Sequence, residues 1–421
     1  MNDPIVGRSR LRQTGSVKAA DISPSFPNAD LAETGGFPWR SSLFRGQGNN
    51  APRRRLEALL GLADIRINGD RPWDLRVHHG DFFTRIAAEG ALGLGDSYIE
   101  GWWNCPEIDE MIARVWQADL PAKVCVWREW PGMLRAQFIN LQRGRRAYQV
   151  GRHHYDIGND LYARMLDRRM IYSCGYWAEA ENLHDAQEAK LDLVCRKLQL
   201  RPGMRVLDIG CGWGGAAKFA AEHYGVHVVG VTVSAEQAGW ARRETAGLPV
   251  EIRLCDYREI GEKFDRIFSI GMFEHVGHRN YGGFFDLVRE CLADDGLFLL
   301  HTIGSLQTTS RPDAWISRRI FPNSMLPSAA QITKAAEGRL VMEDWHNFSA
   351  DYDRTLMSWH GNIEERWHEL DGEKYNNAFR RMWRYYLLGC AGAFRSRKLQ
   401  LWQIVFSRDG VPGGYRPPRI R

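Results

Sequence analysis

The stretch Val206-Leu207-Asp208-Ile209-Gly210-Cys211-Gly212-Trp213-Gly214-Gly215 decides the fold. A short apolar run leads into a turn dense in glycine, and a segment with apolar residues at helical spacing follows. Such a turn forms a cradle for a nucleotide-like cofactor, because glycines let the backbone approach the ligand and the helix start offers free N–H groups. The spacing of Gly210, Gly212 and Gly215 also fits the dinucleotide fingerprint G-x-G-x-x-G, so the turn alone does not name the cofactor.

The next expected strand, residues 226–232, helps to choose the cofactor. A nicotinamide dinucleotide site normally places a carboxylate about 20 residues after the glycine turn, where it binds the ribose. This strand ends without Asp or Glu and runs into the neutral hydrogen-bonding residues Thr232, Ser234 and Gln237. The sequence therefore favours S-adenosylmethionine over a nicotinamide cofactor. A tight turn without any ligand is the weakest alternative for a glycine cluster this dense.

Length and composition exclude several classes of protein. A chain of 421 residues fits two or three domains, and its net charge of +5 is too small to indicate nucleic-acid binding. The same charge is compatible with an anionic membrane surface if it is clustered. The sequence has neither an apolar run of about 18 residues nor the apolar core of a signal peptide. Its eight cysteines show no C-x-x-C pair or zinc spacing, so we expect a cytosolic protein with reduced thiols and no metal site.

The composition changes along the chain and predicts five segments. They are a disordered tail (1–50), a small N-terminal α+β domain (51–120), a linker (121–150), a catalytic domain (151–410) and a basic tail (411–421). In the N-terminal domain we expect helices at 53–62, 82–88 and 107–116, and a hairpin over 64–76 around an Asn-Gly turn.

The linker combines aromatic and basic residues. Trp127 and Trp130 precede Arg143, Arg145 and Arg146. An interfacial helix needs an aromatic face beside a basic face, because apolar groups enter the acyl boundary and arginines meet phosphates. An ordinary helix that joins two domains explains the same pattern, and periodicity alone slightly favours that plain interpretation.

From about residue 190 strand-like and helix-like segments alternate. Strands are expected at 205–209, 226–232, 250–254, 265–270 and 297–302, with helices at 191–200, 235–245 and 284–292. This alternation predicts an α/β, Rossmann-like fold with a doubly wound, mostly parallel sheet and its ligands at the carboxyl ends of the strands. An irregular insertion (305–340) precedes a strand at 340–348, helices at 352–367 and 375–393, and a last strand at 399–407.

Several longer motifs occur together in the chain. They are His154-Tyr155-Asp156-Ile157-Gly158-Asn159-Asp160, Tyr172-Ser173-Cys174-Gly175-Tyr176-Trp177, Met272-Phe273-Glu274-His275-Val276-Gly277, His301-Thr302-Ile303-Gly304 and Gln400-Leu401-Trp402-Gln403. With the glycine stretch, they resemble the cyclopropane-fatty-acyl-phospholipid synthases over roughly residues 55–410. The similarity includes Leu92-Gly93-Leu94-Gly95-Asp96-Ser97-Tyr98, whereas the related mycolic-acid methyltransferases are similar only over the catalytic part.

The resemblance implies a methyltransferase fold that uses S-adenosylmethionine and acts on the cis double bond of an unsaturated phospholipid acyl chain. The product would be a cyclopropane ring. The resemblance also implies a lipid-binding role for residues 51–120, a homodimer, and peripheral association with the inner face of the cell membrane. The expected cofactor-binding residues are Tyr172, Ser173, Asp208, Gly210, Gly212, Gly214, Thr232, Ser234, Gln237, Asp256 and Tyr257.

The chemistry implied by the resemblance requires an unusual base. Methyl addition to an alkene leaves a carbocation, and the new methyl group must lose a proton before the ring closes. The family uses a bound bicarbonate as this base. Its ligands would correspond to Cys174, Glu274, His301, Ile303 through its backbone, and Tyr352. Cys390 also matches a family position, but it lies among small residues, where packing is a better interpretation than catalysis.

Two alternatives remain open from the residues. The first is a related S-adenosylmethionine enzyme that adds a methyl or methylene branch to the acyl chain, since branching and ring closure share their first step. The second is a non-catalytic, lipid-binding relative. The joint presence of Cys174, Glu274, His301 and Tyr352 argues against this second alternative.

Overall fold

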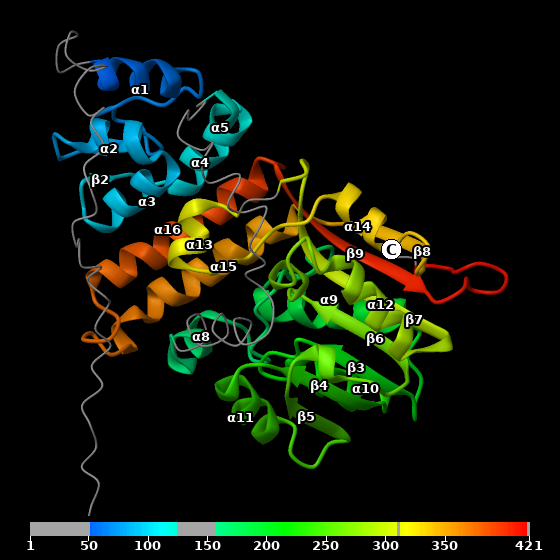
Figure 1. The fold of residues 1–421 in the computed structure, drawn as a ribbon. Helices are drawn as coiled ribbons and strands as arrows, with labels where there is room; N and C mark the ends of the chain where they lie inside the picture. Colours follow the sequence, from blue (N-terminus) through cyan, green and yellow to red (C-terminus); the bar gives the residue numbers. More distant parts are fainter. Residues whose placement is uncertain (1–50, 124–156, 310–311, 419–421) are drawn as a thin grey trace, which may run out of the picture. The chain divides into compact units, whose positions relative to one another are not determined.

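Seven strands form one sheet in the order β5-β4-β3-β6-β7-β9-β8 in the computed structural model (Figure 1). Residues 51–123, 157–309 and 312–418 are described, so the predicted tail (1–50) and most of the predicted linker lie outside the described residues. The strands are β3 (Arg205–Ile209), β4 (His227–Thr232), β5 (Val250–Leu254), β6 (Phe264–Ile270), β7 (Leu292–Ser305), β8 (Val341–Asn347) and β9 (Leu399–Ser407).

The direction of the strands bears on where the predicted cofactor site would lie. β3 pairs in parallel with β4 on one side and with β6 on the other, and β7 continues the parallel part beyond β6. The strand order therefore reverses at β3, which is the position where open α/β sheets bind ligands at the carboxyl ends of their strands. β9 lies between β7 and β8 and is antiparallel to both. The sheet is therefore mostly parallel, as the sequence predicts.

Helices cover both faces of this sheet. Leu207 and Ile209 of β3 belong to the apolar cluster that contains Phe284 of α12 (Tyr281–Cys291). Val206 belongs to the opposite cluster, with residues of α9 (Leu183–Lys197) and α10 (Gly215–Tyr224). Successive side chains of a strand point to opposite faces, so the apolar run of β3 fills two cores.

The N-terminal part consists of short helices and one pair of short strands. Its elements are α1 (Ala51–Gly61), β1 (Arg76–Val77), α2 (Phe82–Glu89), α3 (Ala91–Ile99), β2 (Trp103–Asn104), α4 (Ile108–Gln117) and α5 (Leu120–Lys123). α4 packs against the long helix α16 (Asn377–Arg395), and Gly392 allows this close approach because a Cβ there would lie 2.2 Å from the carbonyl oxygen of Asp109.

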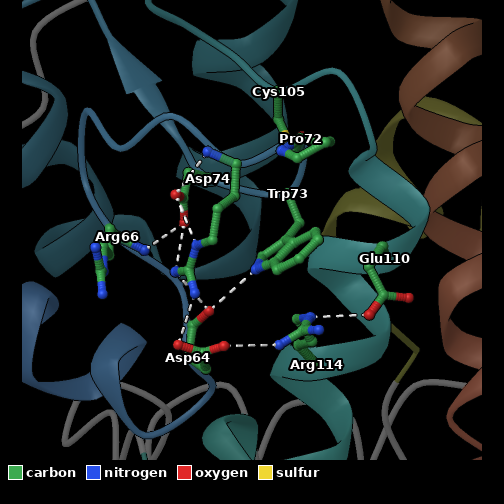
Figure 2. Close-up of polar contacts among 9 residues, drawn as sticks. Asp64, Arg66, Pro72, Trp73, Asp74, Cys105, Glu110 and Arg114 are labelled. Atoms are coloured by element: carbon green, nitrogen blue, oxygen red, sulfur yellow. Dashed lines mark hydrogen bonds and ion pairs between the residues drawn. The ribbon is translucent and has the colours of Figure 1, made fainter.

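The predicted hairpin over 64–76 is wrong, because Ile67 and Leu75 share only an isolated parallel bridge and β1 pairs with β2. The buried carboxylate of Asp74 accepts hydrogen bonds from the backbone N–H groups of Arg66 and Arg71 and from the Arg71 guanidinium (Figure 2). Asp64 in turn forms ion pairs with Arg71 and with Arg114, which lies on α4. One carboxylate thus satisfies several donors of the loop, beside the backbone hydrogen bonds that Asn68 and Leu75 donate across it.

The insertion at 305–340 is more regular than predicted. It contains α13 (Ala314–Arg319) and α14 (Ala329–Ala336). The Asp313 side chain caps α13, while Ser328 and Gln331 form a capping box at the start of α14. The Ser-x-x-Gln spacing is a helix-start signal in the sequence. The insertion leads through β8 to α15 (Asp351–Arg366), which runs beside α16 (Figure 1).

Candidate active site

The glycine turn after β3 opens a pocket at the carboxyl ends of β3, β4 and β6. Gly210 and Gly212 have φ values of 90° and 54°, which side chains strongly disfavour, and a Cβ on Gly210 would lie 2.7 Å from Met272. The pocket is lined by nine of the predicted cofactor-binding residues: Tyr172, Ser173, Asp208, Gly210, Gly212, Thr232, Gln237, Asp256 and Tyr257.

Gly214 and Ser234 were also expected to bind the cofactor, but they lie outside this lining. Gly214 precedes α10 with a φ of 84°, and a Cβ there would lie 2.9 Å from the Cβ of Ala241. It therefore lets α10 approach α11 (Ala235–Glu244). Ser234 caps α11 by accepting a hydrogen bond from the backbone N–H of Gln237. Both residues shape the pocket through the helices that they begin.

Asp208 is the buried acid of the pocket. Its residue is 2% exposed, and its Oδ2 has no hydrogen-bond partner among the described residues. Burial raises the pKa of Asp208 to about 8, and the nearby positive charge of Lys190 opposes this rise. A cationic ligand group at Oδ2 would pair with the carboxylate and restore its charge.

Two residues that hold the pocket together were not predicted from the sequence. Lys190 of α9 lines the pocket and donates from Nζ to Ser173 Oγ at 2.9 Å. Gln187, one turn earlier, donates from Nε2 to the carbonyl oxygen of Ser173 at 2.8 Å. Burial lowers the pKa of Lys190 to about 8. The available signal was their i, i+3 spacing, which places them on one face of α9 together with Leu191 and Val194.

A second cavity of about 1260 Å³ adjoins the cofactor pocket. Tyr172, Ser173, Gly271 and His275 line both, so these residues form the wall that the two spaces share. The cavity extends to the N-terminal helices, and most of its lining is apolar or aromatic. Lining residues from that part of the chain include Ala88, Leu92, Leu94, Ile112, Val115 and Trp116.

Three of the predicted catalytic residues meet on the wall of this cavity. Glu274 accepts a hydrogen bond at Oε1 from the backbone N–H of Ile303 at 2.7 Å, while its Oε2 is unpartnered among the described residues. Burial raises the pKa of Glu274 to about 7. His301 is 1% exposed, and its Nε2 is likewise without a partner in the described part of the chain. Burial lowers the pKa of His301 well below its ordinary value.

The other three predicted catalytic residues are placed differently. Tyr352 lines the cavity and stacks on Phe394 with ring centroids 4.4 Å apart. Cys390 also lines it, and burial raises the pKa of its thiol to about 12, which keeps the thiol protonated. Cys174 lies outside the lining of both spaces, and its thiol donates to the carbonyl oxygen of Gly175. The structure thus brings Tyr352 and Cys390, but not the Cys174 thiol, to the cavity.

Residues 142–404 match the family model of the mycolic acid cyclopropane synthetases. The chain belongs to this family. Its relatives include the cyclopropane-fatty-acyl-phospholipid synthase of Escherichia coli strain K12, which is 52% identical over 362 residues, 86% of this chain and 94% of the relative.

Solved structures of the family share the fold. The cyclopropane synthase MmaA2 from Mycobacterium tuberculosis superposes with a TM-score of 0.58 and 31% identity, covering 62% of this chain and 98% of that one. The mycolic acid cyclopropane synthase CmaA1, solved with S-adenosylhomocysteine (SAH) and CTAB, gives a TM-score of 0.58, 32% identity and the same coverage. The family, the methyltransferase fold and the enzyme class predicted from the sequence are therefore confirmed.

Proposed function

We propose that the protein transfers a methyl group from S-adenosylmethionine to the cis double bond of an unsaturated phospholipid acyl chain and closes a cyclopropane ring. The observation that carries this proposal is the wall shared by the cofactor pocket and the large cavity. Among the described residues, the lining of the cavity contains no Lys or Arg, as suits an acyl chain. A methyl donor in the pocket and an alkene in the cavity would meet at these shared residues, so the two reactants would be held close together.

The cofactor pocket offers polar partners for three parts of S-adenosylmethionine: the ammonium group, the ribose and the adenine amine. We assign Oδ2 of Asp208 to the ammonium group of the ligand. Thr232 and Gln237 are assigned to the ribose; the Thr232 hydroxyl donates to Gln237 Oε1 at 3.0 Å. Asp256 is assigned to the adenine amine. Burial tends to raise the pKa of Asp256, but hydrogen bonds from Arg258 outweigh burial and keep the pKa low, so this acid stays ionised.

The groups on the cavity wall fit a small anion. Bicarbonate, when bound, supplies the base that removes the proton from the transferred methyl group. Glu274 in its protonated form, the N–H of neutral His301 and the hydroxyl of Tyr352 are all uncharged donors. Uncharged donors orient an anion without protonating it, which preserves its strength as a base. Cys174 and the backbone of Ile303, which the sequence also predicted as ligands, stay part of this proposal, although the Cys174 thiol lies outside the lining of the cavity.

The product distinguishes this activity from acyl-chain branching. The protein would be incubated with S-adenosylmethionine and vesicles of a phospholipid with cis-unsaturated chains. A methylene branch and a ring add the same atoms, so mass alone does not decide. We expect the upfield ring-methylene signal in the proton NMR spectrum of the extracted lipid. A product with the added mass but without that signal would overturn ring closure in favour of branching.

The role of the base is tested separately. Turnover in buffer freed of carbon dioxide should fall and should return on addition of bicarbonate. Glu274→Gln should keep S-adenosylmethionine binding in calorimetry but lose most turnover, because the amide lacks the acidic proton. Cys390→Ala should retain turnover if this residue only packs. Turnover near the wild-type level in Glu274→Gln would remove this carboxyl group from the site.

Two further parts of the proposal concern assembly. Within the described residues no helix is both long and apolar enough to cross a membrane. We propose peripheral association with the inner face of the cell membrane, because the N-terminal helices line the cavity that would receive a bilayer lipid. Vesicle co-sedimentation tests this association. We also propose a homodimer, which sedimentation velocity would detect as a species of twice the chain mass.

A further inference from the structure

A row of three polar side chains crosses the antiparallel end of the sheet. His301 of β7 lies opposite Gln403 of β9, and Gln403 lies opposite His346 of β8. Directly opposed residues place their side chains on the same face of a sheet, so the three groups are neighbours. Only His301 of the three lines the cavity. The row therefore extends from the reaction cavity into the sheet.

The contact between His301 and Gln403 determines which ring nitrogen carries the proton. Nε2 of Gln403 lies 3.3 Å from Nδ1 of His301, and both residues are at most 1% exposed. In the structure the amide nitrogen of Gln403 faces Nδ1, and an amide nitrogen donates hydrogen bonds but does not accept them, so this orientation makes Nδ1 the acceptor. In a neutral imidazole the proton then resides on Nε2. This nitrogen is the one without a partner in the described part of the chain.

The surroundings keep this ring neutral. Burial lowers the pKa of His301, and the positive charges of Lys190 and Lys197 lower it further. Lys197 is itself buried and lies 3.4 Å from a carboxylate oxygen of Asp344. Gln403 adds a donor to this environment without adding a charge. A carboxylate at the same position would accept a hydrogen bond from Nδ1–H and favour the charged ring.

We infer that Gln403 is a positioning residue for the reaction, because its amide fixes the imidazole of His301 as the tautomer that presents Nε2–H to the cavity. This inference rests on the proposed function, in which that N–H binds bicarbonate. The direction of the bond matters chemically. With the opposite tautomer, a ring lone pair would face the anion and repel it. A charged ring would donate its proton to the base and consume it.

Two variants of Gln403 separate the direction of its hydrogen bond to His301 from the packing of its side chain. Gln403→Glu keeps the shape of the side chain but replaces the donor with an acceptor, so Nδ1 becomes protonated. Gln403→Leu removes the bond and fixes neither tautomer. The matched control is Gln400→Leu, which removes another buried amide of β9, one that bonds to Asn347 instead. The tautomer is read from the 15N shifts of His301 in histidine-labelled protein without ligands, with assignment by loss of the signal in His301→Asn.

We expect a protonated Nε2 in the wild type and in Gln400→Leu, and a protonated Nδ1 in Gln403→Glu. The bicarbonate concentration for half-maximal turnover should rise about tenfold or more in Gln403→Glu and less in Gln403→Leu, since one hydrogen bond is at stake. The KM for S-adenosylmethionine should stay within about twofold of the wild type, because the cofactor pocket is untouched.

A protonated Nδ1 in the wild type would overturn the inference, even if the variants fail to fold. An unchanged tautomer in Gln403→Glu would overturn it as well. A different result bears on the proposed function alone. If the tautomers follow expectation but wild-type turnover does not depend on bicarbonate, Gln403 still positions His301, while the base assigned above is wrong.

Discussion

Arg319 donates from Nε and Nη2 to the two carboxylate oxygens of Asp96, each at 2.9 Å. Asp96 lies on α3 of the N-terminal part and is 5% exposed, whereas Arg319 ends α13 of the insertion. The preceding residue, Gly95, touches the same helix, since a Cβ there would lie 2.2 Å from Nε1 of Trp315. The ion pair and the glycine thus fix α13, which carries Trp315 on the cavity wall, to α3.

Asp96→Asn should loosen this wall. The amide cannot accept both bonds of the guanidinium, so we expect a loss of about 2 kcal/mol in the free energy of unfolding. The KM for phospholipid vesicles should rise, while S-adenosylmethionine affinity stays constant. The control is Glu100→Gln, which breaks the more exposed pair with Arg85 and should cost less than about 1 kcal/mol. Equal losses in both variants would contradict a special role for the buried pair.

Gly95→Ala should force Trp315 to move. Overpacking of this kind costs about 1–3 kcal/mol. The displaced indole should also change the cavity, so turnover should fall most with the bulkiest acyl chains. Gly361→Ala is the matched control in α15, because nothing lies within 4 Å of its added Cβ. There the loss of backbone freedom in the unfolded chain should stabilise the protein by up to about 1 kcal/mol. Stabilisation by both substitutions would show that Trp315 adapts freely.

Glu274 should make stability depend on pH. Burial raises its pKa from 4.5 to about 7, so between these values the folded protein retains a proton that the unfolded chain releases. Its contribution is therefore fully present below pH 4.5 and is lost as the pH rises to about 7. The stability of the wild type relative to Glu274→Gln should fall by about 3 kcal/mol across this window. Denaturant unfolding at a series of pH values measures the difference, and a constant difference would contradict the raised pKa.

Binding of S-adenosylmethionine at pH 7 should release a proton from Asp208. Burial raises the pKa of this acid to about 8, so Asp208 is mostly protonated at pH 7 in the free protein. The positive charge of the ligand's ammonium group should favour the ionised carboxylate. Calorimetry in buffers with different ionisation enthalpies counts the protons. Asp208→Asn should abolish the release.

Lys190→Met should raise the pKa of Asp208 further, because the charge of Lys190 opposes the effect of burial. S-adenosylmethionine should then bind more weakly at pH 7 and recover affinity at higher pH. Lys218→Met, which removes a more exposed lysine of α10 that pairs with Glu244, is the control and should leave the pH profile unchanged. A profile shifted equally by both variants would point to a general charge effect.

Features that depend on residues close together in the chain were predictable from the sequence. The glycine turn at 210–215 predicts its own geometry, because positive φ angles select glycine locally. Prediction failed at 64–76, where the Asn-Gly signal suggested a hairpin. The carboxylate of Asp74 instead binds the backbone of Arg66, eight residues earlier. Lys190 and Gln187 were not predicted, because the sequence of their helix does not indicate that it packs against the segment containing Ser173.

By itself, the sequence determined the family and the α/β fold and predicted the residues that line the candidate cofactor pocket, since these depend on short motifs and on the period of apolar residues. Only the tertiary structure brought His301 to Gln403 across 102 positions, and Asp96 to Arg319 across 223. The physical reason is that sheet register and helix packing decide such pairs. A register shift by one residue would turn Gln403 to the other face, although the sequence would be unchanged.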